Sequence, residues 1–191
     1  GKGTHFCAGA DIDWMQKLAI SSLQLNREDA ENLARLLYQM YSFPKPLIGL
    51  AQGSTMGGGL GLLLCCDAVI ATEEANFCFS EAKIGLAPSV VSPYVVAVLG
   101  ERATRYYFLT AQKFSAQEAF RLGLAHQLVP SKLLAKAGEI VSRQMLNNSP
   151  SALSEITRIL PIVAGIVITR ESTDDTADIL ERYRLSNEAI E

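Results

Sequence analysis

One carboxylate, Glu81, is the best candidate for a group that transfers a proton. It stands in the segment Phe79–Pro88, where Ile84 and Leu86 are among its apolar neighbours. Burial beside apolar groups disfavours the ionised carboxylate and raises its pKa toward neutrality, where a glutamate can act as a general base or acid. Taken alone, a glutamate at this position is more often an exposed side chain that begins a turn.

Two glycine-containing turns could direct backbone N–H groups at an anion. The first elbow is Cys7–Asp11 and the second elbow is Gly53–Gly59. Glycine tolerates positive φ and close approach of the main chain, and a helix beginning near Gly59 adds free N–H groups and a positive dipole end. Such a place suits a phosphate or a developing oxyanion. The spacing matches neither the dinucleotide-binding pattern nor a P-loop, and glycines that only permit tight helix–strand packing are the simpler alternative.

The remaining reactive side chains form no recognisable constellation. His5 and His126 are the only histidines, and neither accompanies a G-x-S-x-G nucleophile motif, so serine catalysis is a weaker second enzyme hypothesis. Two separate histidines and dispersed carboxylates predict no metal site. The four cysteines have neither disulfide nor zinc spacing, which favours small buried hydrophobic groups in a reducing compartment.

The composition is that of one soluble globular unit. The 191 residues are 49% apolar and 19% charged, which suffices for a substantial core. Seventeen basic and 20 acidic residues are interspersed and give a net charge of −3, so we expect no nucleic-acid or anionic-membrane partner. Apolar runs fall short of the ~18 residues that cross a bilayer, and no signal peptide is recognisable. We expect a cytoplasmic protein. Because Gly1 opens the chain in place of Met, we also expect missing terminal segments.

Strand, elbow and helix signals alternate through the first half of the chain. Asn26 is the predicted cap of a helix whose apolar positions recur at helical spacing from Ala30 to Tyr41 and which ends before Pro44. Short apolar runs bounded by turn residues predict buried strands. The other predicted elements are helices over Ile12–Leu18 and Leu60–Cys66 and strands over Leu47–Gln52 and Ala68–Thr72.

The second half is predominantly helical. Gly100 separates two expected helices, and Ser115 with Glu118 forms a capping box that begins a third. The remaining expected helices are Ser131–Leu146, Ser151–Leu160 and Thr173–Ala189, and the last carries an apolar stripe suited to packing on another subunit. We therefore expect an α/β core over residues 1–128 and a helical region over residues 129–191.

The ordered set of motifs resembles the enoyl-CoA hydratase/isomerase (crotonase) family. Each motif is moderately specific, but together they span essentially the whole chain. The resemblance implies a superhelix of strand–strand–helix turns that lacks the opening strands of the family, followed by a helical trimerisation region. It also implies a homotrimer or a dimer of trimers. The motifs are Phe6–Ile12, Pro44–Ile48, Met56–Leu60, Phe79–Pro88 and Phe114–Ala119.

The same resemblance assigns roles at a site. In the family, two backbone amides hold the thioester carbonyl, and the matching residues are Ala10 and Gly58. Glu81 matches the catalytic acidic segment, which reverses the preference for an ordinary surface glutamate. The substrate would be an acyl-CoA thioester, with no cofactor because coenzyme A is part of the substrate. The residues implied in substrate binding are Ala8, Asp11, Ile12, Gly57 and Pro88.

Gly61 departs from the family pattern. Hydratases with two glutamates carry the other acid/base residue at this position. With one glutamate, a Δ3,Δ2-enoyl-CoA isomerase is a serious alternative to a hydratase, and a catalytically degenerate acyl-CoA-binding subunit is a third. Further likeness to bacterial methylglutaconyl-CoA hydratases, which also have Gly here, favours hydration in leucine or terpenoid breakdown.

Overall fold

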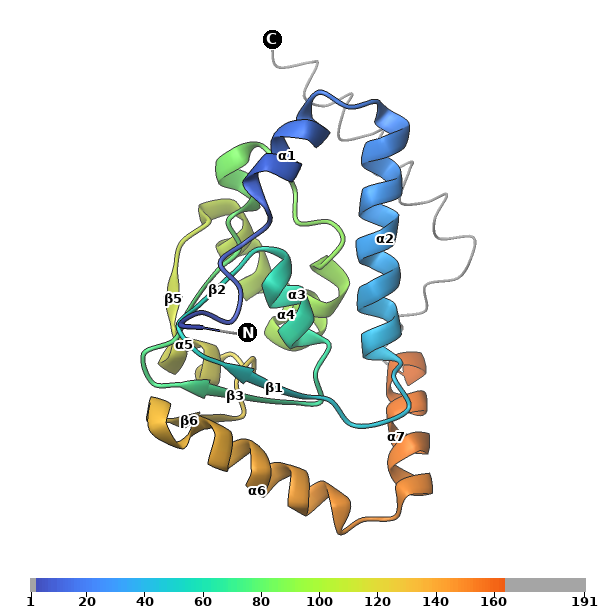
Figure 1. Cartoon of the computed structure of the whole chain (residues 1–191), viewed down its shortest axis with the longest axis vertical. Helices are drawn as coiled ribbons and strands as arrows, with labels where there is room; N and C mark the ends of the chain where they lie inside the picture. Colours follow the sequence, from blue (N-terminus) through green and yellow to red (C-terminus); the bar gives the residue numbers. More distant parts are fainter. Residues whose placement is uncertain (1–2, 164–191) are drawn as a thin grey trace.

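Two small three-stranded sheets lie at the centre of the molecule (Figure 1). The computed structural model describes residues 3–163. All strands of the first sheet are parallel, whereas the second sheet joins one parallel and one antiparallel pair. The first sheet has the order β1 (Ile48–Ala51), β3 (Ala68–Thr72), β6 (Gln127–Val129), and the second has the order β2 (Ser54–Met56), β4 (Asn76–Cys78), β5 (Phe114–Ser115).

The chain forms these sheets in repeated strand–strand–helix turns. β1 and β2 lead into α3 (Gly58–Leu64), and β3 and β4 lead through the 3-10 helix η1 (Glu81–Ile84) into α4 (Ser92–Thr110). In each turn the first strand joins one sheet and the second strand joins the other. This confirms the predicted α/β superhelix. Strands as short as β2, β4, β5 and β6 were not predicted, because two or three residues carry no readable periodicity.

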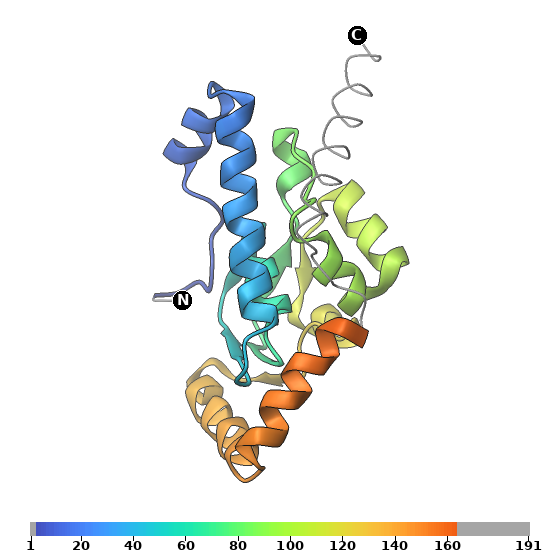
Figure 2. The same ribbon diagram turned by 90° about the vertical axis from the view of Figure 1, so that its right-hand side faces the viewer.

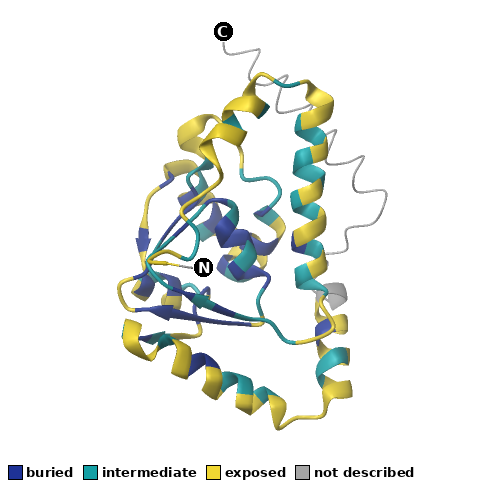
Figure 3. Cartoon of the chain, viewed as in Figure 1, coloured by how far each residue is buried: buried dark blue, intermediate teal, exposed yellow. Residues whose placement is uncertain are grey.

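The core gathers between the sheets and the helices that follow them (Figure 3). The apolar helix α3 buries Leu60, Leu63 and Leu64, and every residue of β3 is buried. Phe77 and Phe114 stack with ring centroids 5.6 Å apart. Each fully buried side chain of this size contributes roughly 1.5–3 kcal/mol, so the core holds the turns around α3 in place.

Two helices precede the first sheet, and α2 (Leu23–Tyr41) stands beside the core in both ribbon views (Figures 1 and 2). The prediction that Asn26 caps this helix is wrong. Ser22 is the cap, and its hydroxyl accepts a hydrogen bond from the Leu25 amide at 3.3 Å. The Asn26 amide already donates to the Ser22 carbonyl, so Asn26 lies one turn inside the helix. The first helix, α1 (Ile12–Ala19), buries none of its residues.

The second half follows the predicted order with one local difference. Gly100 has φ 75° and ψ 159°, which interrupts α4 as expected. The Ser115 hydroxyl accepts from the Glu118 amide at 3.2 Å and begins α5 (Ala116–Arg121). The predicted return contact of Glu118 is replaced by hydrogen bonds from Arg121 and Tyr107, because a guanidinium is a stronger partner than a backbone amide.

Of the last described helices, α6 (Leu134–Leu146) lies below the first sheet and α7 (Pro150–Val163) stands to its side, beneath α2 (Figure 1). After η2 (Ser131–Leu133), α6 runs along β1 and β3, and α7 follows (Figure 2). The predicted division after residue 128 falls inside β6 and stays a prediction. The expected helix Thr173–Ala189 lies outside the described residues. No helix within residues 3–163 combines the length and apolar character that a membrane span requires.

Candidate active site

The two glycine elbows lie side by side. Cys7 forms a parallel bridge with Thr55, in which the Cys7 amide donates to the Ser54 carbonyl at 3.2 Å and the Met56 amide donates to the Cys7 carbonyl at 2.9 Å. A Cβ on Gly59 would lie 2.5 Å from the Cys7 Cβ. The first elbow therefore packs directly on the start of α3, at a distance that only glycine at position 59 permits.

The amides of Ala10 and Gly58 have no acceptor among the described residues. Gly9, with φ +117°, turns the chain just before Ala10, and Gly58 is the first residue of α3. An amide in the first helical turn has no carbonyl one turn earlier to bond. Both predicted oxyanion donors are thus free N–H groups on neighbouring elbows, and their common target stays a prediction.

Glu81 lies over the second elbow. One carboxylate oxygen, Oε1, is 3.3 Å from the position that a Cβ on Gly57 would occupy. The other oxygen, Oε2, is buried and has no hydrogen-bond partner within the described part of the chain. Burial raises the pKa of the Glu81 carboxyl above its ordinary value. A carboxylate in this environment is poised to take and return a proton.

Gly57 is required for this approach. Its φ of 52° and ψ of −129° lie outside the regions that residues with a Cβ favour, and its amide donates to the Cys78 carbonyl at 3.0 Å. A side chain here would also meet the Glu81 carboxylate. The conformation of Gly57 therefore links the second elbow to β4 and leaves the space that Glu81 occupies.

Position 61 has no room for a second acid. A Cβ on Gly61 would lie 2.6 Å from Val91 Cγ1 and 3.2 Å from Leu37 Cδ1. Both neighbours are core residues, with Val91 2% exposed and Leu37 fully buried. Aliphatic side chains therefore fill the space next to Gly61 into which a glutamate side chain would extend.

The predicted substrate-binding residues divide into two groups. Gly57 lies with Glu81, whereas Ala8, Asp11 and Ile12 are exposed on and just after the first elbow. Asp11 caps α1 by accepting from the Trp14 amide at 3.0 Å. Pro88 follows η1 and is half-buried, and no described hydrogen bond joins it to either elbow.

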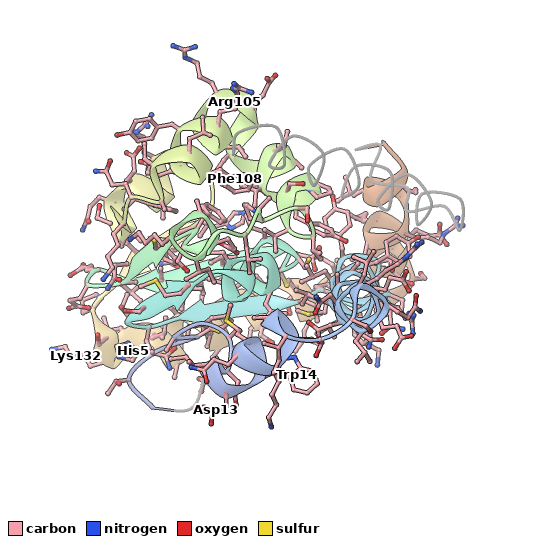
Figure 4. All side chains as sticks on the ribbon, turned by 90° about the horizontal axis from the view of Figure 1, so that it is seen from above. His5, Asp13, Trp14, Arg105, Phe108 and Lys132 are labelled. Carbon is pink, nitrogen blue, oxygen red and sulfur yellow. The ribbon has the colours of Figure 1, made fainter. Side chains whose placement is uncertain are left out.

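Trp14 and Asp13 lie on the surface near the first elbow. Figure 4 shows Trp14 beside α1 and α2, where its indole Nε1 donates to Asp29 at 3.1 Å. The Trp14 side chain remains 51% exposed, so it ties the two helices together without entering the core. Asp13 points away from the body of the protein (Figure 4).

Sequence reasoning missed several residues that surround the predicted donors. Leu33 on α2 approaches to 3.8 Å of a Cβ on Gly58, although its helical spacing indicated only a core position. The hydroxyl of Ser80 lies near Gly57, and its adjacency to Glu81 was the only available signal.

The histidines and Asp67 have structural roles. The Nδ1 atoms of His5 and His126 accept hydrogen bonds from the amides of Ser54 and Val69, each at 3.0 Å. Asp67 accepts from the Leu47 amide at 2.7 Å. All four cysteines are free thiols, and two of them are buried. The expectation of buried cysteines is confirmed for Cys65 and Cys78, whereas Cys7 and Cys66 are only partly buried.

The alternating strand–strand–helix turns and the paired elbows define a protein of the crotonase fold. A family model described as enoyl-CoA hydratase/isomerase matches residues 1–172, and the chain belongs to this family. A crystal structure of an enoyl-CoA hydratase from Shewanella pealeana is 42% identical with a TM-score of 0.83, over 100% of this chain and 71% of that chain. Pseudomonas aeruginosa AtuE is 29% identical with a TM-score of 0.82, over 97% of this chain and 72% of that chain.

Curated relatives agree with this assignment. The mevalonyl-coenzyme A hydratase of Aspergillus fumigatus is 36% identical over 155 residues, which are 80% of this chain and 56% of that protein. The hydroxycinnamoyl-CoA hydratase-lyase of Pseudomonas fluorescens is 31% identical over 80% of this chain and 56% of that protein. The chain spans from 47% to 66% of the length of the first curated relatives that it matches.

Proposed function

We propose that the protein adds water to a 2-enoyl-CoA thioester through a stabilised enolate. The water oxygen bonds to C3, the electron pair of the C2–C3 double bond shifts to C1–C2, and the carbonyl π pair moves onto the thioester oxygen to give the enolate. Glu81 removes a proton from the water and returns it to C2. The Ala10 and Gly58 amides donate hydrogen bonds to the oxygen as its negative charge develops.

The position of Glu81 over the second elbow carries this proposal. The carboxylate oxygen is 3.3 Å from a Cβ position on Gly57, the residue immediately before the predicted donor Gly58. A proton-transfer group from η1 and a free amide of α3 therefore meet at the second elbow. Losing a donor of this kind typically raises the barrier by about 3 kcal/mol, and losing the acid/base group costs roughly 10²–10⁴ in rate.

The packing around Gly61 supports a mechanism with one carboxylate. Val91 and Leu37 occupy the direction in which a second glutamate would extend. Glu81 would then carry out both proton steps of hydration in turn, first as a base toward water and then as an acid toward C2. Its raised pKa suits a group that must hold a proton between the two steps.

For the substrate, we propose a branched 2-enoyl thioester such as methylglutaconyl-CoA, formed in leucine or terpenoid breakdown. The support is the Gly at position 61 and the likeness of the elbow and Ser80–Pro93 segments to bacterial hydratases of that kind. The relative named for mevalonyl-CoA indicates that hydratases of other acyl groups share this framework.

An isomerase is the second candidate, and the single carboxylate is the observation that favours it. Moving a double bond from C3–C4 to C2–C3 needs one base that takes a proton from C2 and delivers it to C4, or the reverse. Within the elbows and η1, Glu81 is the carboxylate that reaches Gly57. The same enolate and the same two amides would serve this reaction.

The test is a panel of enoyl-CoA esters assayed with the purified protein at its full natural length. Hydration removes the ultraviolet absorbance of the conjugated thioester, whereas isomerisation of a 3-enoyl ester creates it. We expect hydration of branched 2-enoyl esters, and Glu81→Gln should abolish it while acyl-CoA binding persists. Thioester binding without turnover of any ester would contradict catalysis and favour a degenerate binding subunit.

A further inference from the structure

Ser80 occupies a helix-capping position but its side chain does not cap. It precedes η1 with φ −91° and ψ −1°, and its hydroxyl accepts no amide of the helix. A serine at this position usually bonds the amide two or three residues later. Here the Lys83 amide donates instead to the Ser80 backbone carbonyl at 3.1 Å. The common structural explanation for a serine at this place is therefore absent.

The Ser80 hydroxyl and the Glu81 carboxylate instead approach the same point on the second elbow. Its Oγ is 3.8 Å from a Cβ position on Gly57, and Glu81 Oε1 is 3.3 Å from the same point. Ser80 is half-buried, and its hydroxyl makes no hydrogen bond with the described residues. Two polar groups therefore flank the second elbow, one able to accept a proton and the other able to donate and accept hydrogen bonds.

In the proposed hydration, Glu81 supplies one polar contact to the attacking water. A bound water usually makes two to four hydrogen bonds. The family position that would supply the second contact is Gly61, where Val91 and Leu37 exclude a polar side chain. Among the three atoms nearest to the Gly57 Cβ position, the only group besides Glu81 is the Ser80 hydroxyl.

We propose that the Ser80 hydroxyl holds the attacking water against Glu81, in place of the missing second glutamate. This inference rests on the proposed hydration. The water donates one proton to the Glu81 carboxylate, its oxygen forms the bond to C3, and the proton passes from Glu81 to C2. Ser80 exchanges no proton, so it is a water-positioning residue. Its contribution belongs to hydration and not to proton exchange at C2.

The test compares two reactions of Ser80→Ala in the full-length protein. Hydration is followed by loss of conjugated absorbance, and exchange of the C2 protons of butyryl-CoA in D2O is followed by mass spectrometry. We expect hydration kcat to fall about tenfold to a hundredfold, as for loss of one hydrogen bond to a reacting group, while C2 exchange stays within about twofold. Ser80→Thr, which keeps the hydroxyl, should retain most of the hydration rate.

The controls separate this inference from its premise. Ser142→Ala, a half-buried serine on α6, should change neither reaction. If Ser80→Ala slowed both reactions equally, or neither, the water-positioning role would be overturned while hydration by the wild type still stood. If the wild type exchanged C2 protons but hydrated no ester, the proposed function itself would fail.

Discussion

The Glu81 side chain has a buried carboxylate oxygen without a hydrogen-bond partner, although the residues that follow Glu81 are exposed. Oε2 has no partner among the described residues, and burial raises the pKa of the carboxyl. A buried charged group without a full set of hydrogen bonds destabilises the folded state. Such a costly group at the second elbow fits the proposed role in proton transfer.

The pH dependence of the rate follows from the raised pKa of Glu81. Hydration begins with the ionised carboxylate as a base, so kcat/KM should rise with pH as Glu81 loses its proton. We expect the midpoint of this acid limb to lie above the ordinary glutamate value of about 4.3. A pH–rate profile measured with a branched 2-enoyl ester checks this, and a midpoint at or below that value would contradict the assigned base.

The stability of the fold should depend on the same titration in the opposite sense. A carboxyl whose pKa is raised on folding contributes its stability below the pKa of the unfolded chain, and the contribution is lost as pH rises through the folded pKa. Glu81→Gln should therefore unfold at a higher urea concentration than the wild type at pH 7. At a pH below about 4 the two proteins should converge. Equal urea midpoints for the two proteins at pH 7 would show that ionisation of Glu81 does not destabilise the folded state.

At the scale of elements, the approach of the first elbow to α3 depends on the missing side chain of Gly59. Gly59→Ala would place a Cβ 2.5 Å from the Cys7 Cβ, which cannot swing away because it is attached to the backbone of the elbow. We expect a loss of about 1–3 kcal/mol in the free energy of unfolding, measured with urea, together with lost hydration.

Gly58→Ala is the matched control for stability. Its Cβ would meet only Leu33 Cδ2 at an ordinary 3.8 Å, so the free energy of unfolding should change by less than about 1 kcal/mol. Equal destabilisation by the two substitutions would mean that the contact between the elbows does not decide the geometry.

Packing between α3 and the start of α4 explains why the second glutamate cannot simply be restored. Gly61→Ala in a helix would ordinarily stabilise by 0.5–1 kcal/mol, but here the new Cβ meets Val91 Cγ1 at 2.6 Å. We expect net destabilisation by roughly 1–3 kcal/mol. Combining it with Val91→Ala should recover part of that loss, with a coupling energy of about 0.5–3 kcal/mol.

Val95→Ala is the control for this cycle. Val95 is also fully buried on α4, but it is not among the nearest neighbours of position 61. Its effect should add to that of Gly61→Ala without coupling. If the effects of Gly61→Ala and Val91→Ala were also additive, the contact between the new Cβ and Val91 would not be the cause of the destabilisation.

At the scale of the whole molecule, the described end of the chain exposes apolar side chains suited to association. On α6 and α7 they are Ile140, Leu146, Ile156, Ile159 and Leu160, each at least 47% exposed. Exposed apolar groups that cluster on neighbouring helices are typical of subunit interfaces. The homotrimer or dimer of trimers stays a prediction, and the expected helix Thr173–Ala189 lies outside the described residues.

We expect light scattering after size exclusion to give three or six times the chain mass for the protein. Replacing Ile156 and Ile159 on α7 by aspartate should shift the population toward the monomer if α7 contributes to the interface. Exchanging Lys83 for Ala, on the exposed part of η1, is a control that should leave the mass unchanged. A monomeric wild type would contradict the assembly.

The sequence predicted the longer elements well and the short ones poorly. The kink at Gly100 and the buried strand Ala68–Thr72 were readable because glycine and a continuous apolar run carry strong local signals. The cap of α2 was misplaced at Asn26, since Ser22 and Asn26 are both good capping residues and only the helix start distinguishes them. Strands of two or three residues exist through pairing with distant partners, which no local pattern records.

By itself, the sequence determined the family and the order of the elbows and predicted Glu81 as the acid, because these depend on residue types in linear order. Only the tertiary structure decided that Cys7 packs on Gly59, that Glu81 and Ser80 meet at Gly57, and that Val91 and Leu37 fill the space at Gly61. These facts are distances between residues far apart in the chain. Such distances follow from how buried side chains fill the space between helices and sheets, and local preference does not encode them.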